Sequence, residues 1–418
     1  MSTIYPSLLV ACNVKSYKDC KTHSWYDMKK YKNYKQSPLQ HEHIDTTYID
    51  TIKIVIEPTL KQQKILRLWF NDCIDIYNIA NQHYKDTLRE YKPKINWINT
   101  RKELNDHIID VCKKNTLNKH TGDYAIKHCA EMYKSAVSNH NYMSKFDIKN
   151  LEKSRSRKNL IIEPASVSKK ENAIFIKVLG EMKSNLPLNL IKRNSILQYD
   201  KNTKKYIIIV PQTKDDIRTV NRVDKCGIDI GVRTFLTTYS DNESLEIGTS
   251  NTTYKLMNKC HKKLDNLQCS HDNKNISNVC YNKARLKCQQ KLRHKIDDMH
   301  NKMASYLVKN YREIIIGKVS TKQMVSNITG NLYKPTKRRL LTLSHYRFRM
   351  KLKSMAVKYN ANIVEVSEYL TSKTCCVCGN INDNLGASKT YDCNRCKIII
   401  DRDINSAINI YENKVLSR

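Results

Sequence analysis

Four cysteines near residue 400 restrict the fold of this chain more than any other feature. They stand in the pattern C-x2-C-x14-C-x2-C and are Cys375, Cys378, Cys393 and Cys396. Each close pair forms a knuckle that presents two thiolates, and two knuckles complete the tetrahedral shell of a structural zinc ion. We therefore predict one Zn²⁺ with no open position for substrate. The spacing alone also allows two disulfides or a four-iron cluster.

The charge balance indicates the class of partner. The chain has 74 Lys and Arg against 40 Asp and Glu, a formal charge of +34 over 418 residues. Such an excess repels itself in a compact protein unless a polyanion neutralises it. We therefore expect nucleic acid as the partner, with binding that weakens steeply as salt rises.

The sequence also argues against export and against a membrane partner. It holds no run of roughly 18 apolar residues, the length that a membrane span needs. We expect no signal peptide, because the early apolar run from Tyr5 to Ala11 is short and lacks a basic region before it. The 15 cysteines are thus expected to be reduced thiols or metal ligands of an intracellular protein.

Hydrophobic periodicity divides the first half of the chain. Residues 1–50 are polar and basic, and we interpret them as a loose extension. Alternating isoleucines over 52–56 predict a strand, after which Thr59 and Gln62 fit a capping box that opens a helix. Helical patterns then extend to about residue 145. Short strands follow from about 160 to 222, most clearly in the segments "AIFIKVLG" and "KYIIIVP".

From residue 223 onward, predicted strands and helices alternate, which is a mixed α/β order. The helices include a long basic stretch from about 252 to 311, another basic helix from about 342 to 358, and a closing helix in "DINSAINIYEN". Basic clusters in the two halves are candidate nucleic-acid contacts, although the first also fits a solvated linker. These residues are Lys153, Arg155, Arg157, Lys158, Lys337, Arg338, Arg339, Arg347 and Arg349.

Two aspartates have a context that suggests metal binding. Asp229 lies within the strand "CGIDIGVRT", and its side chain is expected on the face of the strand opposite to that of its isoleucine neighbours. Glycines on both sides leave room for a ligand or a backbone to approach. Asp403 either caps the last helix or, if Asp401 is the cap, is free to bind a metal. Hydrolysis of a phosphodiester by two Mg²⁺ ions needs several carboxylates on one surface. Glu313, Glu368 and Glu365 are the candidates for the third.

Several of these segments together resemble a known family. The segments "GIDIGVRTF", "YREIIIGKV", "LTSKTCCVCG" and "CNRCKIIIDRDINSAINI" resemble the transposon-encoded TnpB nucleases and their eukaryotic and viral relatives, the Fanzor proteins. The similarity runs in the same order from about residue 52 to 413. It implies an RNA-guided DNA endonuclease that uses a guide RNA from the mobile element, target DNA, a structural Zn²⁺ and catalytic Mg²⁺. The expected location is the nucleus or a viral or cytoplasmic replication site of the host.

The resemblance also implies a fold and a division into domains. The fold is a multidomain α/β protein with a RuvC-like, ribonuclease-H-type mixed sheet and an inserted zinc ribbon, preceded by a β-barrel wedge domain that holds an inserted helical recognition domain. The implied domains are a basic extension (1–50), the wedge domain (51–58 and 159–222), the recognition domain (59–158), the nuclease domain (223–370 and 398–418) and the zinc ribbon (371–397).

Carried over residue by residue, the resemblance assigns the catalytic carboxylates. Asp229 takes the first position and Asp403 the third. At the second position, bacterial members have a glutamate after the strand that reads "IIIGK" here, but this chain has Gly317. Many Fanzor proteins resemble this arrangement and have a replacement glutamate shortly before the TS-x-TC motif, a place that Glu368 fits. The expected Mg²⁺ ligands are therefore Asp229, Glu368 and Asp403.

Two other functions stay open at the level of sequence. A non-cleaving nucleic-acid-binding regulator of the same fold is favoured by Gly317 and opposed by the three retained carboxylates. A structure-specific nuclease without a guide, such as a junction resolvase, would not need the N-terminal half or the long basic helices.

Overall fold

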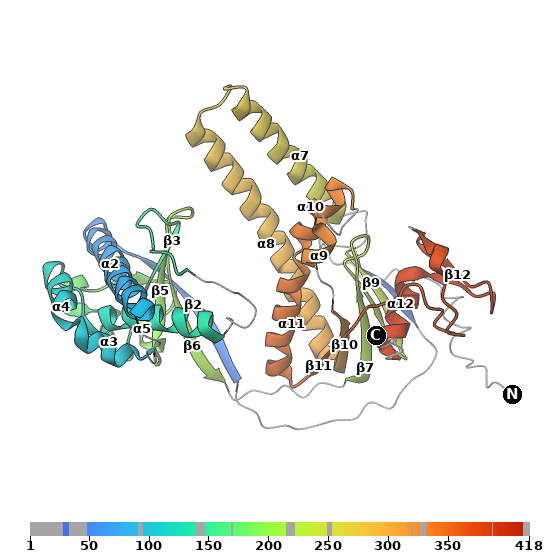
Figure 1. Ribbon diagram of the computed structural model, residues 1–418, viewed down its shortest axis with the longest axis horizontal. Coiled ribbons are helices and arrows are strands. Elements are labelled where there is room, and N and C mark those ends of the chain that lie inside the picture. Colours follow the sequence, from blue (N-terminus) through green and yellow to red (C-terminus); the bar gives the residue numbers. More distant parts are fainter. Residues whose placement is uncertain are drawn as a thin grey trace. The chain divides into compact units, whose positions relative to one another are not determined.

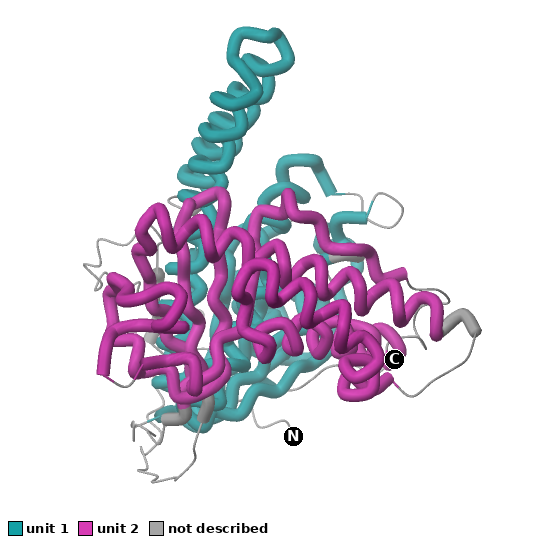
Figure 2. The backbone as a smooth tube through the Cα atoms, turned by 90° about the vertical axis from the view of Figure 1, so that its left-hand side faces the viewer, with its two compact units in different colours: residues 1–48, 215–418 teal, residues 49–214 magenta. Residues whose placement is uncertain are grey.

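The computed structural model describes residues 28–32, 48–90, 95–138, 147–168, 170–214, 222–248, 253–318, 321–326, 332–386 and 388–412. The chain divides into two compact units, which Figure 2 shows in different colours. Unit 1 combines Met1–Tyr48 with Asp215–Arg418, and unit 2 comprises Ile49–Lys214. Within the described ranges, no helix has both the length and the apolarity that a membrane crossing needs.

Unit 2 contains a five-stranded sheet with the order β3-β5-β6-β2-β4. Its strands are β2 (Tyr48–Glu57), β3 (Arg157–Ile162), β4 (Lys183–Ser184), β5 (Ser195–Asp200) and β6 (Lys205–Lys214). Its helices are α2 (Leu60–Glu90), α3 (Trp97–Glu103), α4 (Asn105–Lys114), α5 (Lys119–Ser138) and the short α6 (Ile176–Leu179), with 3-10 turns at Pro164–Ser166 and Leu188–Leu190. The predicted capping box is confirmed: the amide of Thr59 donates to Gln62 Oε1 at 2.8 Å.

One hydrophobic core joins the sheet and the helices of unit 2. It contains Ile54 from β2, Trp69 and Phe70 from α2, and Ile126 from α5. The barrel and the domain boundaries at 59 and 158 stay predictions. The strand predicted for "AIFIKVLG" is wrong, because Phe175 has a left-handed backbone with φ of 48° and the chain then forms α6.

Unit 1 is built on a six-stranded mixed sheet with the order β1-β9-β8-β7-β10-β11. Its strands are β1 (Met28–Lys32), β7 (Val223–Ile230), β8 (Leu236–Tyr239), β9 (Glu243–Ile247), β10 (Tyr311–Gly317) and β11 (Asn362–Val366). Neighbours from β1 to β7 pair antiparallel, whereas β7, β10 and β11 run parallel. The prediction of a loose extension over 1–50 is wrong for Met28–Lys32, which pair with β9.

Helices cover both faces of this sheet. The helices described in unit 1 are α7 (Thr253–Asp272), α8 (Asn278–Asn310), α9 (Thr321–Val325), α10 (Lys334–Leu343), α11 (His345–Tyr359) and α12 (Arg402–Tyr411), of which α8, α11 and α12 contact the sheet. Residues of α8 and α11 share a core with Ile228 and Ile230, on one face of β7. Helix α12 packs on β7 and β8 from the other face, beside the cysteine module with β12 (Thr390–Asp392), β13 (Ile399–Asp401) and a 3-10 turn at Asp383–Leu385 (Figure 1).

A glycine on β7 explains how closely α12 approaches the sheet. A Cβ atom at Gly227 would lie 2.5 Å from the carbonyl oxygen of Ala407 and 2.6 Å from the amide nitrogen of Tyr411. Any side chain at this position would therefore push the helix away. Because side chains alternate along a strand, Asp229 lies on the same face of β7 as Gly227, toward α12.

Candidate metal centre and carboxylate site

The four cysteines gather into one cluster, as their spacing predicted. Their sulfur atoms all lie within 4.8 Å of one another, with 3.5 Å from Cys375 to Cys396 and from Cys378 to Cys393. A tetrahedron with zinc–sulfur bonds of about 2.3 Å places its sulfurs about 3.8 Å apart. Disulfide bonds of about 2.05 Å are excluded at these distances. In a four-iron cluster each thiolate binds a different iron, so its sulfurs would stand farther apart. The cluster can hold one zinc ion.

Backbone amides stabilise thiolates in the same way in both knuckles. The amides of Val377 and Cys378 face the sulfur of Cys375, and those of Arg395 and Cys396 face the sulfur of Cys393. Burial raises the pKa of Cys393, but these amides together with hydrogen bonds to the thiols of Cys378 and Cys396 lower it to about 7. At Cys375 burial outweighs the amides, and the pKa is raised. The turn after each pair is left-handed, with φ of 71° at Gly379 and 60° at Lys397.

Two of the predicted carboxylates, Asp229 and Glu368, lie where three parallel strands end, and Asp403 lies in the first turn of α12. Asp229 is the penultimate residue of β7, and Gly317 ends β10. Ile316 pairs with Ile228, and Gly317 pairs with Val366 at the end of β11, two residues before Glu368. The carboxyl ends of parallel strands meet at one edge of a sheet, which is the usual place for a ligand site.

Glu368 occupies the space that a side chain at position 317 would fill. A Cβ atom on Gly317 would lie 1.8 Å from Glu368 Oε1, 2.3 Å from its Cγ and 2.4 Å from its Cδ. The glutamate therefore reaches the end of β10 from the neighbouring segment. Its Oε1 atom is buried and has no hydrogen-bond partner among the described residues.

The other two candidates for the third carboxylate are used elsewhere. Glu365, inside β11, forms ion pairs with Lys353 at 3.0 Å and with Arg349 at 3.8 Å. Glu313 lies near the opposite end of β10 and accepts a hydrogen bond from the Asn362 amide group at 3.3 Å. Glu368 is thus the glutamate that lies beside Asp229.

Helix capping leaves Asp403 available. The N-cap of α12 is Asp401, whose Oδ1 accepts hydrogen bonds from the amides of Asp403 at 2.8 Å and Ile404 at 3.3 Å. The side chain of Asp403 is therefore not needed as a cap. This agrees with the second of the two options given by the sequence, in which Asp401 is the cap. Asp401 also pairs with Lys389 at 3.3 Å, and Lys389 contacts the buried Glu246 at the same distance.

Burial and mutual repulsion make these carboxylates hard to ionise. Burial, and then the charge of Asp403, raise the pKa of Asp229 to about 7. Burial and the charge of Asp229 raise the pKa of Glu368 to about 8. Burial, followed by Asp401, also raises the pKa of Asp403. A bound divalent cation would relieve this repulsion, because it favours the ionised form of each group.

Helix α12 connects the carboxylates to the cysteine module through buried polar side chains. Ser406 Oγ donates to Asp229 Oδ1 at 3.0 Å and lies 3.1 Å from Thr371 Oγ1. The side-chain amide of Asn409 donates to the carbonyls of Thr371 at 2.8 Å and Thr374 at 2.7 Å. Asn405 donates to the same Thr374 carbonyl and accepts from the amide of Cys376 at 2.9 Å.

Sequence reasoning missed these positioning residues. Asn405, Ser406 and Asn409 are each at most 1% exposed, although polar residues in a helix are usually on the surface. The available signal was the hydrophobic periodicity of "DINSAINI", which places the two asparagines and the serine on the apolar side of the helix. A helix whose first polar residues serve only as a cap shows the same periodicity. The periodicity therefore does not identify the residues that these buried side chains contact.

The predicted basic contacts have varied surroundings. Arg338 pairs with Asp265 at 2.8 Å, Arg347 pairs with Asp297, and Arg349 is largely buried against Glu365. Lys337 donates to the carbonyl of Ser326, and Arg339 lies over the ring of Tyr254.

In unit 2, the basic run lies partly beside a cavity. Lys153 pairs with Asp75 at 2.7 Å and Arg157 pairs with Asp200 at 3.2 Å. Arg155 and Lys158 line a cavity of about 410 Å³. A role of these residues in binding nucleic acid stays a prediction.

Comparison with known proteins gives the family. A family model described as "Probable transposase" matches residues 208–327, and one described as "Cas12f1-like, TNB domain" matches residues 345–410. The second covers Glu368, the four cysteines and Asp403.

Individual relatives extend over nearly the whole chain. The TnpB-like proteins R854 and L770 of Acanthamoeba polyphaga mimivirus are each 34% identical over 95% of this chain, covering 82% and 84% of their own lengths. Among solved structures, a Cas12f1–sgRNA–target DNA complex matches 88% of this chain and 100% of its own at 14% identity, with a TM-score of 0.35, too low to add weight. From the length and identity of the viral matches, the chain belongs to the TnpB-like transposase family.

Proposed function

We propose that this protein is a DNA endonuclease that hydrolyses phosphodiester bonds with Mg²⁺ held by Asp229, Glu368 and Asp403. The observation that carries the proposal is the position of Glu368 over Gly317. This placement supplies a carboxylate at the strand end where bacterial relatives are expected to have one.

The donor set fits Mg²⁺. Hard divalent cations prefer carboxylate oxygens, and Mg²⁺ in phosphoryl chemistry is held by a few carboxylates together with water and substrate. The unpartnered Oε1 of Glu368 is a buried oxygen that such an ion would satisfy. The described carboxylates do not converge within 4.8 Å as the cysteines do. A wider arrangement suits two ions, which stand about 3.5–4 Å apart in two-metal sites.

The chain's own residues prepare this site in three ways. Ser406 holds Asp229 by one oxygen, so the orientation of its carboxylate is fixed before any ligand binds. Asp401 caps α12, so the side chain of Asp403 is available to bind a metal. Asn409 and Asn405 fix the segment that follows Glu368. Bound Mg²⁺ would activate a water and neutralise charge on the scissile phosphate.

We further propose that cleavage is directed by a guide RNA from the mobile element. Two observations support this: membership in the TnpB-like family and a net charge of +34, which exceeds what a small nuclease site needs. Unit 2 would then provide the wedge and recognition domains. The domain boundaries given above are part of this proposal.

The test uses the full chain co-expressed with its native transcript. Bound RNA is sequenced, and DNA that matches its 3′ end is incubated with Mg²⁺. Asp229→Ala, Glu368→Ala and Asp403→Ala should each abolish cleavage while RNA binding remains. Full activity of the Glu368 variant would overturn the assignment of that residue. Bound RNA without any cleavage would favour the regulator, and cleavage without RNA would favour a guide-free nuclease.

A further inference from the structure

The hairpin formed by α7 and α8 carries a charge that its own fold does not need. Residues 253–310 contain thirteen Lys and Arg against four Asp and no Glu. In Figure 1 the two helices extend together away from the sheet of unit 1. Their outer halves share only a narrow apolar seam, which includes Tyr281, Cys288 and Leu292. So small a core leaves most side chains of the outer hairpin exposed.

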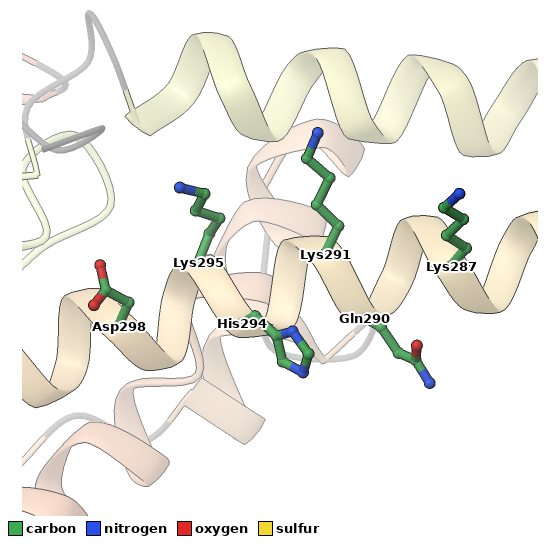
Figure 3. Close-up of a pocket in the computed structure, with 6 residues that line it drawn as sticks. All are labelled: Lys287, Gln290, Lys291, His294, Lys295 and Asp298. Atoms are coloured by element: carbon green, nitrogen blue, oxygen red, sulfur yellow. The ribbon is translucent and has the colours of Figure 1, made fainter. Parts of the chain in front are cut away.

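The lysines of α8 form a regular row. Lys283, Lys287, Lys291 and Lys295 recur at intervals of four residues, which is about 6 Å along a helix. Figure 3 shows the last three in succession along one edge of α8, where they line a shallow groove with Gln290, His294 and Asp298. Like charges at this spacing repel each other and weaken a helix. The row therefore opposes helix stability unless an anion lies along it.

Helix α7 repeats the arrangement. Lys255, Lys259 and Lys263 also recur every fourth residue, and Lys262 lies beside them. Lys259, Lys262 and Lys263 line a second groove of about 360 Å³. We name these two sets, Lys283–Lys287–Lys291–Lys295 on α8 and Lys255–Lys259–Lys263 on α7, the lysine rows.

The ion pairs of the hairpin's carboxylates are with residues outside these rows. Asp265 pairs with Arg338, Asp297 with Arg347, and Asp298 with Lys302. Asp272 contacts His271 at 3.5 Å. Among the described residues, Lys287 and Lys291 are exposed and have no carboxylate partner. The matching negative charge for these two lysines would come from another molecule.

We propose that the lysine rows of α7 and α8 bind the sugar–phosphate backbone of the nucleic acid that this protein holds. The proposal rests on the proposed nucleic-acid function and adds the surface that grips the backbone. Lysines contact phosphates as point charges without reading bases, so the binding is independent of sequence. A regular row along a straight helix suits a polymer with regularly spaced phosphates better than an acidic protein patch.

The test measures how the affinity of the full-length protein depends on salt. Fluorescent RNA duplex, RNA–DNA hybrid and DNA duplex, each of the same length, are titrated between 50 and 200 mM KCl. The variant Lys283→Gln/Lys287→Gln/Lys291→Gln removes three charges, and glutamine keeps the helix propensity. A matched control, Lys102→Gln/Lys113→Gln/Lys114→Gln, removes three exposed lysines from α3 and α4 of unit 2.

Each lost phosphate contact lowers the salt slope by about 0.7–0.9. The row variant should therefore lose about 2 to 3 units of slope. Across this fourfold range of salt, wild-type affinity should fall roughly 40-fold more than that of the row variant. Because the control lysines lie in the proposed recognition domain, the control can lose some slope, but it should lose less than the row variant. The arm with the largest difference identifies the backbone that the rows hold, RNA or DNA.

Three results would overturn the proposal, and they separate it from the proposed function. If the row variant keeps the wild-type slope while wild type binds tightly, the rows are not the gripping surface although the function stands. If the control loses as much slope as the row variant, the charge acts diffusely and the rows have no special role. If wild type binds none of the three ligands but binds an acidic protein, both proposals fail.

Discussion

The substitution Gly317→Ala tests the rearranged carboxylate site with a single methyl group. The new Cβ would lie 1.8 Å from Glu368 Oε1, whereas real Cβ atoms keep at least about 3.0 Å from other heavy atoms. The glutamate side chain must therefore retreat by at least 1.2 Å, the difference between these distances. Because the obstructing atoms are the far end of a flexible side chain, the backbone can stay in place.

The expected effect is on activity and not on folding. A displacement of about 1 Å at a reacting centre can cost about 10²-fold in rate, or ~2.7 kcal/mol of transition-state stabilisation. Gly317 does not have a positive φ, so alanine is compatible with its backbone. Such a replacement reduces the entropy of the unfolded chain and stabilises by about 0.4–1 kcal/mol. The melting temperature and zinc content should therefore be maintained while Mg²⁺-dependent cleavage falls.

A variant that moves the carboxylate from position 368 to position 317 provides the matched control. Glu368→Ala alone removes the carboxylate, and Gly317→Glu in the same chain offers one from the end of β10. The double variant should cleave faster than Glu368→Ala alone, because both positions reach the same space. Wild-type cleavage by Gly317→Ala, measured on plasmid or labelled duplex at saturating Mg²⁺, would refute the reasoning that this space is part of the site.

Three further predictions concern the surroundings of the site. Cys378→Ser should release zinc, measured by metal analysis, and reduce cleavage; normal cleavage by the zinc-free variant would make the ion a local staple only. Asn409→Ala removes a donor from the carbonyl of Thr371 and leaves the carbonyl of Thr374 with the amide of Asn405, so it should lower the free energy of unfolding by about 1–3 kcal/mol in urea titrations; an unchanged midpoint would show that water replaces the amide. Since the raised pKa values of Asp229 and Glu368 keep protons on the folded chain that the unfolded chain releases, metal-free stability should fall between about pH 4 and pH 8. Mg²⁺ should therefore raise the melting temperature more at pH 8 than at pH 6, and equal shifts would argue that these carboxylates do not bind it.

The sequence predicted those parts of the site that depend on local pattern. The cysteine cluster follows from ligand spacing, because two close pairs of cysteines are typical of a structural zinc site. The strand around Asp229 and the helix after Asp403 follow from periodicity. The choice of Asp401 as the cap could be stated only as one of two options, since both aspartates precede the helix.

The remaining parts depend on contacts between distant segments. The position of Glu368 over Gly317 requires the register of β10 against β11, which no local pattern encodes. The edge strand Met28–Lys32 was missed because its polar composition is typical of a loop, and its pairing with β9 is a tertiary effect. Phe175 was read as part of a strand because left-handed backbone is rare for aromatic residues.

The hydrogen bond from Ser406 to Asp229 has a consequence for when the site exists. These residues are 177 positions apart in the chain. During synthesis the strand with Asp229 is made long before α12, and proteins fold largely in the order in which they emerge. A chain that ends before α12 therefore has Asp229 without its Ser406 partner, has no Asp403, and has no assembled site. Cutting ability should appear only after α12 has been synthesised and has closed over Gly227, so that nascent chains are harmless to the nucleic acids around them.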